Sequence, residues 1–309
     1  MRRPRVFKQA PGLLAFVAIT EVSSAAAAQV DLSERRSDSY YAAHAATIGG
    51  LFAASLAMQS VHHRSAGADP EWFPGDRSLR GRYSRSAALV SNVPLVLAIV
   101  DPMLVGLSRG ANYRFLNASV AYTEALAAAE TLNATAKVAF SRPRPYTYAL
   151  DTNGARGVEA SLDFYVSFYS GHSSSAFTSA VAGSYVYAEV LPTREWRWLL
   201  WGSEFAFASA TANLRVRAGK HYYSDVAVGA MAGSVVGIAI PWLHGVRYSP
   251  EPGEYIAAGA GLGLGILVSQ LFPFSSSPTS AHTVGQPLRE VEASAHWPPK
   301  PGVAVRGSF

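Results

Sequence analysis

Apolar residues gather into seven long segments along the chain, separated by shorter polar stretches that contain Gly, Pro, Asp and Ser. The alternation of apolar and polar residues that is typical of strands does not dominate in any of them. Their Ala-rich and Gly-rich composition favours helices that pack closely against one another. The predicted helices cover residues 39–59, 84–107, 117–137, 170–190, 196–214, 224–243 and 256–271.

This order of segments predicts an all-α protein, an up-and-down bundle of about six core helices within residues 39–246. A further apolar helix is expected within residues 247–272. Residues 273–309 are rich in Ser and Pro, so we expect a disordered tail there. Residues 67–81 and 143–169 predict loops, and the second is long enough to carry functional groups.

The N-terminal segment, residues 1–28, has the order of a secretory signal. Arg2, Arg3 and Arg5 precede an apolar run, and small residues follow it up to Ala28. We therefore expect export with cleavage near Ala28. Glu21 interrupts the apolar run, so an uncleaved N-terminal anchor is the alternative.

The overall composition lies between that of soluble and membrane proteins, with 49% hydrophobic and 15% charged residues. Six segments approach the ~20 residues that cross a bilayer. The third, however, carries Glu124 and Glu130, which a bilayer tolerates poorly. We favour an exported periplasmic protein whose helices pack on one another. An integral membrane protein with its active site facing the periplasm is the alternative.

Charge and cysteine content exclude several classes of function. The net charge is +5, but the basic residues are scattered and lack interleaved aromatic residues for base stacking. Nucleic acid is therefore not a predicted partner. The chain has no cysteine, which excludes thiol catalysis, thiolate metal sites and disulfide bonds.

The residues with candidate chemistry lie beside predicted helix ends. Lys137 ends the third helix and His172 begins the fourth. Arg215 follows the fifth helix, while His221 and Asp225 lie at the start of the sixth. Because these four ends share one face of an up-and-down bundle, we expect the side chains to converge there.

This set of residues suits the binding of a phosphate group. The charge of a transferring phosphoryl group is spread over its oxygens, so several fixed cations stabilise it. Lys137, Arg144 and Arg215 can supply them. The turn at Ser170 and Gly171 adds backbone N–H groups at a helix N-terminus, which attract anions.

The two histidines can divide the remaining chemistry. His221 is the candidate nucleophile, because Asp225 four residues later can orient and charge-stabilise the ring if the sixth helix begins at His221. His172 is then the general acid that protonates the leaving group. No metal is required, because the cationic side chains do the work of a metal ion.

Three sequence motifs occur in a characteristic order. The first is Lys137, six residues, then Arg144 and Pro145; the second is Tyr169-Ser170-Gly171-His172; the third is Leu214-Arg215, five residues, His221, three residues, Asp225. This pattern resembles the type 2 phosphatidic acid phosphatase superfamily, which includes bacterial class A acid phosphatases and vanadium haloperoxidases. The resemblance implies phosphate-binding roles for Lys137, Arg144, Ser170, Gly171 and Arg215, a nucleophilic His221 and an acid at His172.

The chain departs from the family pattern at two positions. Tyr169 stands where the second motif has proline, and Leu214 stands where the third has serine, and neither change removes a reacting group. Arg142 and Pro143 form a second Arg-Pro pair, two residues before Arg144 and Pro145. Only the spacing from Lys137 favours Arg144 as the arginine of the first motif.

The predicted function is a metal-independent, cofactor-free phosphatase that works through a phosphohistidine. Its substrate is a phosphorylated small molecule or a lipid phosphate or pyrophosphate, and membrane association stays open. A vanadate-dependent haloperoxidase is the alternative, in which His221 would hold vanadate as the cofactor.

The remaining histidines and two glutamates are predicted to have structural roles. Glu124 and Glu130 are expected to pair with arginines rather than to contact the site. The histidines expected to be packed or surface residues are His44, His62, His63, His244, His282 and His296.

Overall fold

The computed structural model describes residues 31–60, 73–150, 163–191, 193–274 and 277–278. The predicted signal segment, residues 1–28, lies outside the described residues. So do most of the predicted tail and four of the remaining histidines, His62, His63, His282 and His296.

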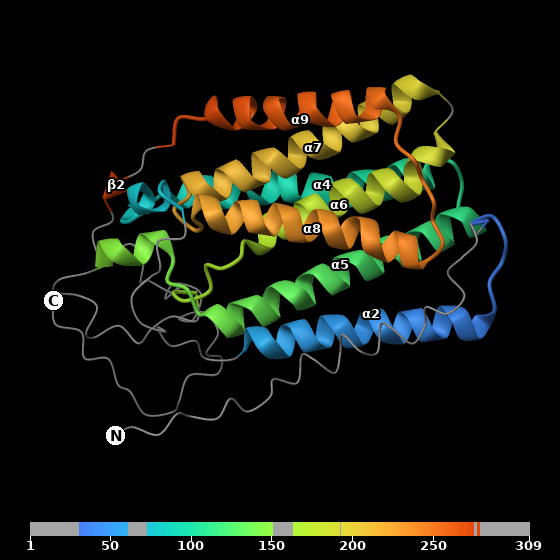
Figure 1. Ribbon diagram of the computed structural model, residues 1–309, viewed down its shortest axis with the longest axis horizontal. Coiled ribbons are helices and arrows are strands. Elements are labelled where there is room, and N and C mark those ends of the chain that lie inside the picture. The colour runs from blue at the N-terminus through green and yellow to red at the C-terminus, as the bar shows by residue number, and fades with distance from the viewer. Residues whose placement is uncertain (1–30, 61–72, 151–162, 192, 275–276, 279–309) are drawn as a thin grey trace, which may run out of the picture.

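The described residues form an all-α protein, as the sequence predicts (Figure 1). The α-helices are α2 (Asp38–Gln59), α3 (Arg85–Val90), α4 (Asn92–Leu107), α5 (Tyr113–Phe140), α6 (Gly171–Tyr187), α7 (Arg194–Arg217), α8 (Tyr223–Leu243) and α9 (Pro252–Gln270). Short 3-10 turns are η2 (Asp76–Leu79), η3 (Pro145–Leu150) and η4 (Ala188–Val190). Two residue pairs join β1 (Arg82–Tyr83) to β2 (Ser277–Pro278) in antiparallel register.

Local geometry sets the boundaries of two of the predicted helices. The segment predicted at residues 84–107 divides at Ser91 into α3 and α4. Pro94 lies in the first turn of α4, where a missing N–H costs no intrahelical hydrogen bond. Helix α5 begins four residues earlier than predicted, because the Asn112 side chain accepts a hydrogen bond from the Phe115 N–H and caps it.

Helix α6 is the centre of the bundle. It packs against α4, α5, α7 and α8, and almost all of its residues are buried. Helix α2 lies along α5 on one side of the molecule, and α9 lies along α7 on the other (Figure 1). The predicted additional helix of residues 247–272 is therefore α9, an outer layer on α7.

Glycines spaced four residues apart let α8 approach α6 closely. Gly229, Gly233 and Gly237 face α6, and a Cβ atom on Gly233 would lie 2.2 Å from the carbonyl oxygen of Ser174. Small residues at this spacing allow direct contact between helix backbones. The contact fixes the start of α8 beside the start of α6, where His172 lies.

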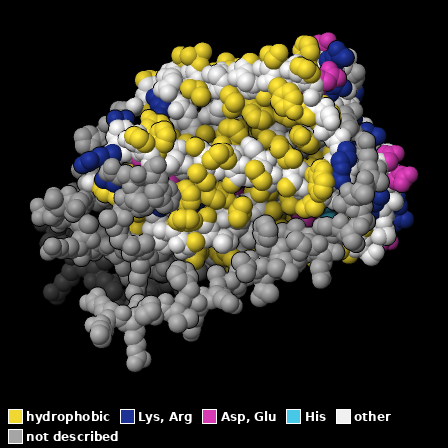
Figure 2. Space-filling model, in the orientation of Figure 1, with side chains coloured by type: hydrophobic (Ala, Val, Ile, Leu, Met, Phe, Trp, Pro, Cys, Tyr) yellow, Lys and Arg dark blue, Asp and Glu magenta, His cyan; other side chains and the backbone are white. Residues whose placement is uncertain are grey.

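Much of the lateral surface of the bundle is apolar. Figure 2 shows hydrophobic side chains across the middle of one face, while Lys, Arg, Asp and Glu gather towards its two ends. Exposed apolar residues include Leu104 on α4, Val235 on α8 and Ile256 on α9. Among the described residues, three helical segments are long and apolar enough to cross a membrane, Asp38–Gln59, Arg85–Leu107 and Tyr223–Leu243.

The two glutamates of α5 point towards partners inside the bundle. Glu130 accepts a hydrogen bond from the Ser175 hydroxyl on α6. Glu124 contacts His44 and His244, so the prediction that it pairs with an arginine is wrong. Because acidic residues of membrane bundles face the interior and pair there, the glutamates do not exclude a membrane location.

Candidate active site

One pocket of about 340 Å³ opens where α5 ends and α6 begins. Six residues predicted from the sequence line it: Lys137, Arg144, Gly171, His172, Arg215 and His221. The other lining residues are Met58, Gln59, Ala134, Asp163 and Val166. The structure thus brings together residues that are far apart in the sequence: His221 follows Lys137 by 84 residues.

Helix geometry explains this convergence. Lys137 lies in the last turn of α5 and Arg215 in the last turn of α7, while Gly171 begins α6. His221 lies between α7 and α8. The positive end of α6 therefore faces the same space as the cationic side chains, which makes the pocket attractive to an anion.

The ring of His221 is held in one tautomer. Its Nδ1 lies 2.8 Å from the carbonyl oxygen of Ser167, which can only accept, so the proton is on Nδ1. Its Nε2 therefore carries the lone pair, and Arg144 donates to it over 3.3 Å. Burial, together with the positive charges of Arg144 and Arg215, holds the pKa of His221 well below its usual range. The ring is neutral and nucleophilic at Nε2.

Arg144 is fixed by polar contacts on both sides. Its guanidinium pairs with Asp163 at 2.9 Å and donates to the Lys220 carbonyl at 2.9 Å. Asp163 also pairs with the Lys220 ammonium at 2.6 Å. Burial works to raise the pKa of Asp163, but Arg144 and Lys220 outweigh it and lower this pKa to about 2. Asp163 is therefore a carboxylate that orients two cations.

Two further cations are available to an anion. Neither Lys137 nor Arg215 forms an ion pair with a carboxylate among the described residues. The Nε of Arg215 is buried and lacks a hydrogen-bond partner in the described part of the chain. The buried Arg215 and the half-buried Lys137 lack acidic partners among the described residues and leave a net positive charge in the pocket, which a phosphate would neutralise.

Gly171 is needed for the shape of the pocket. A Cβ at this position would lie 2.8 Å from Oδ1 of Asn133 and 3.4 Å from Nζ of Lys137. Asn133 cannot easily move away, because its Nδ2 donates to the Tyr169 carbonyl at 2.7 Å. The glycine thus lets the lysine ammonium lie beside the first turn of α6.

Two predicted site residues, Ser170 and Asp225, do not line the pocket. Ser170 is fully buried at the N-cap of α6, where its hydroxyl accepts from the Ser173 N–H at 3.3 Å. Its side chain therefore forms the helix start and does not face the pocket.

Asp225 does not hydrogen-bond directly to His221, and the sixth helix does not begin at His221. Helix α8 begins at Tyr223, after His221, and the nearest carboxylate oxygen of Asp225 lies 3.8 Å from the ring nitrogen. The carboxylate instead accepts from the Ser167 hydroxyl at 2.6 Å and from the Tyr222 N–H at 2.9 Å. Asp225 therefore positions His221 through the residues on either side of the ring.

Arg142 belongs to a buried network behind this arrangement. It donates to Asp225 at 2.7 Å and to Asp76 at 3.1 Å, and its guanidinium lies 4.0 Å from the centre of the Tyr222 ring. Of the two rival arginines, Arg144 lines the pocket, in agreement with the choice made on spacing.

His172 lies across the pocket on the first turn of α6. Its Nε2 is 2.9 Å from the side-chain oxygen of Asn92 on α4, which can only accept. The Nε2 therefore carries a proton. The contact fixes the orientation of the ring that was predicted to be the acid.

Sequence reasoning missed Asn92, Asp163 and Ser167. Asp163 and Ser167 lie in the predicted loop of residues 143–169 and Asn92 at the break between α3 and α4, where no motif distinguishes them. The signal that could have found Asp163 is its position as an isolated acid in a loop beside a basic site.

Comparison with known proteins gives one match. The family model of the PAP2 superfamily matches residues 118–249, which include every predicted site residue. No curated protein and no solved structure matches the chain.

Proposed function

From the match of residues 118–249 to the PAP2 superfamily model, we propose that the chain is a phosphatase that hydrolyses a lipid phosphate or pyrophosphate at a membrane surface. The reaction passes through a phosphohistidine on His221. The observation that carries this proposal is the state of the His221 ring. Its Nδ1–H is bound to the Ser167 carbonyl, and its Nε2 lone pair faces a pocket of cations.

In the first step, the Nε2 of His221 attacks phosphorus, and the bond from phosphorus to the leaving oxygen breaks. His172, protonated on both ring nitrogens while the anionic substrate is bound, gives its Nδ1 proton to that oxygen and keeps its Nε2 proton hydrogen-bonded to Asn92. In the second step, a water attacks phosphorus and passes a proton to His172, and the bond from phosphorus to His221 breaks. Ester and water thus become alcohol and phosphate, and both histidines return to their starting states.

The cations of the pocket act on the phosphoryl oxygens. Asp163 aligns Arg144. When Arg144 donates to the phosphate, it no longer donates to the Nε2 of His221, and the lone pair of that nitrogen becomes available for attack. Arg215 and Lys137 contribute charge without an acidic partner to compete with the substrate. Fixed positive charges stabilise the phosphoryl transition state without reorganisation.

The chemistry of the lining residues supports a metal-independent reaction. Divalent metals in phosphoryl transfer are held by carboxylates. Asp163 is the one carboxylate among the described lining residues, and it is engaged by Arg144 and Lys220. The electrostatic role of a metal falls to the arginines and Lys137.

A membrane location and a lipid substrate are supported by the surface of the bundle. The three apolar helical segments and the apolar middle of the face in Figure 2 fit a bilayer about 30 Å thick. Met58, Ala134 and Val166 add an apolar wall to the cationic pocket. We propose an integral membrane protein whose pocket faces the periplasm.

The test uses the full chain purified in detergent. Rapid quenching with radiolabelled substrate should trap an acid-labile, base-stable phosphoenzyme. The His221→Ala variant should form none and should lose turnover of both a short-chain phosphatidic acid and a chromogenic phosphomonoester. Retention of near wild-type turnover by His221→Ala would refute the phosphohistidine mechanism. Equal turnover of both substrates, with no preference for the lipid, would refute the lipid assignment alone.

A further inference from the structure

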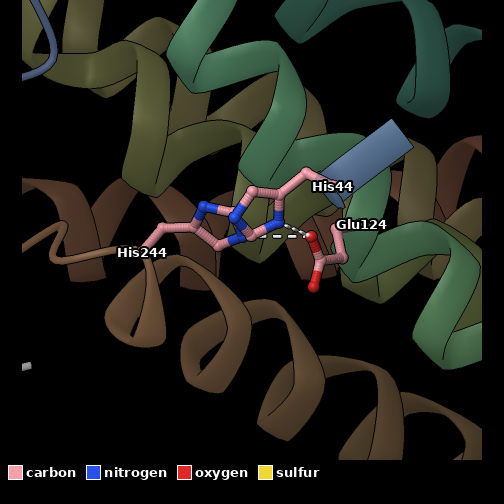
Figure 3. Close-up of side chains that lie close together, drawn as sticks. All are labelled: His44, Glu124 and His244. Carbon is pink, nitrogen blue, oxygen red and sulfur yellow. Dashed lines mark hydrogen bonds and ion pairs between the residues drawn. The ribbon is translucent and has the colours of Figure 1, made fainter. Parts of the chain in front are cut away.

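A second cluster of chemically active side chains lies away from the pocket. Figure 3 shows His44 on α2 and His244 at the end of α8 directed at the carboxylate of Glu124 on α5. The Nδ1 of His44 is 2.6 Å from the Glu124 Oε2, and the Nε2 of His244 is 3.3 Å from the same oxygen. Thirteen residues of α5, about 20 Å, separate Glu124 from Lys137 in the pocket.

These three side chains form a set of metal ligands. Their ligand atoms all lie within 4.8 Å of one another. Two imidazoles and one carboxylate suit Zn²⁺ and its first-row neighbours and do not suit Mg²⁺ or Ca²⁺, which take oxygen ligands. Atoms bound at about 2.1 Å to one tetrahedral ion lie about 3.4 Å apart, so small side-chain rotations would complete the site.

The charge of the cluster calls for a cation. The Glu124 side chain is only 9% exposed, and its ion-pair partners among the described residues are the two histidines. If both rings are neutral, a buried carboxylate lacks a compensating charge, which is costly. Either one ring is protonated, or a metal ion takes the place of its proton.

The surroundings of His244 favour the metal. Its other ring nitrogen, Nδ1, lies 2.9 Å from the Tyr40 hydroxyl. Histidines that bind metals generally engage their second nitrogen with an oxygen in this way, which fixes the tautomer and the ring orientation. The His244 side chain is 4% exposed and that of His44 12%, so the ligands are shielded while an approach through His44 stays open.

We propose that His44, Glu124 and His244 bind a Zn²⁺-type divalent ion that ties α2 to α5 and α8. Helix α2 needs such a tie, because Leu51 and Ser55 are its only described residues with buried positions. The ion is structural and lies apart from the phosphate pocket. Its binding does not depend on the phosphatase proposal.

The test measures metal binding on untagged protein in detergent, because a polyhistidine tag would bind the same metals. Elemental analysis should find near-stoichiometric zinc. Protein stripped with chelator should unfold at a lower temperature, and Zn²⁺ should restore its stability by mass action whereas Mg²⁺ should not. Stripped protein titrated with Co²⁺ should develop the visible absorption of a four-coordinate nitrogen and oxygen site.

Variants assign the binding to this cluster. His44→Gln, Glu124→Gln and His244→Gln should each lose zinc and the zinc-dependent thermal shift. Tyr40→Phe should still bind, with affinity about 10-fold to 100-fold weaker. Absence of uptake by the stripped wild-type protein would overturn the proposal and leave a hydrogen-bonded ion pair.

A control at the other site separates the two proposals. His172→Gln should lower phosphatase turnover and keep zinc, while Glu124→Gln should lose zinc and still form the phosphoenzyme. Zinc binding that persists in Glu124→Gln would overturn the assignment of the ligands. Loss of the phosphoenzyme in zinc-free Glu124→Gln protein that remains folded would overturn the separation of the ion from the pocket.

Discussion

Asp225→Asn tests whether this carboxylate positions the nucleophile through its neighbours. Asp225 is fully buried and accepts hydrogen bonds from Arg142, Ser167 and Tyr222. The asparagine side chain keeps one oxygen that accepts hydrogen bonds. Its N–H₂ group replaces the other carboxylate oxygen and faces an N–H donor, of Arg142 or Tyr222, that cannot accept a hydrogen bond from it. Breaking a buried ion pair in this way costs about 3–5 kcal/mol of the free energy of unfolding. The backbone on both sides of His221 should then shift.

The expected effect on catalysis is a loss of rate without an equal loss of anion binding. A misplacement of about 1 Å at the nucleophile can cost about 100-fold in kcat. The phosphate-binding cations do not contact Asp225, so inhibition by vanadate, which mimics the five-coordinate phosphoryl group, should change by only a few-fold.

The assay compares kcat, the vanadate inhibition constant and the thermal midpoint in wild type, Asp225→Asn, Ser167→Ala and the double variant. Because Asp225 acts through the Ser167 hydroxyl, the two kcat effects should be less than additive. The reasoning is refuted if the vanadate constant weakens as much as kcat falls. Fully additive losses in kcat would equally refute it and favour a direct contact between Asp225 and the ring.

Three further predictions follow from the pocket. Gly171→Ala places a Cβ 2.8 Å from the Oδ1 of Asn133, so inhibition by vanadate should weaken by about tenfold, or 1.4 kcal/mol. The control is Gly259→Ala, which has open space around it and should leave the inhibition unchanged. Because Arg144 helps to lower the pKa of His221, Arg144→Gln should move the NMR titration of that ring to higher pH, and an unmoved titration contradicts the electrostatic account. His172→Ala should slow alkyl phosphates far more than activated aryl phosphates, and a dependence on leaving-group pKa no steeper than that of wild type would show that His172 is not the acid.

The fold could be predicted because apolar segments and polar breaks recur along the whole chain. The glycines of α8 and the alanines of α5 and α6 reflect close helix contacts that a sequence displays directly. Boundaries were less predictable where a single cap decides them, as Asn112 does for α5. The division at Ser91 likewise depends on local geometry and not on the nearby prolines.

The candidate site could be predicted where the chemistry needs a particular residue type at a helix end. Lys137, Arg144, Arg215 and both histidines lie around one pocket for that reason. The partners of these groups could not be predicted, because Ser167 acts through its backbone carbonyl and Asp163 comes from an irregular loop.

The cluster at His44 illustrates a different limit. Each of its members is unremarkable in sequence, since 80 residues separate His44 from Glu124 and 120 separate Glu124 from His244. The sequence pattern therefore predicts ordinary packed or surface positions for the two histidines and an arginine partner for Glu124. Only the packing of α2 and α8 beside α5 brings the three side chains together.

Helix α2 connects the two sites physically. It lies before the residues that match the PAP2 superfamily, yet Met58 and Gln59 at its end line the phosphate pocket. His44 lies about 21 Å away along the same helix. Because α2 behaves as a rigid rod over that distance, a tie at His44 limits how far its other end can move. A metal ion at His44 would thus limit the movement of Met58 and Gln59 in the pocket wall, without contacting the residues proposed to carry out the phosphoryl chemistry.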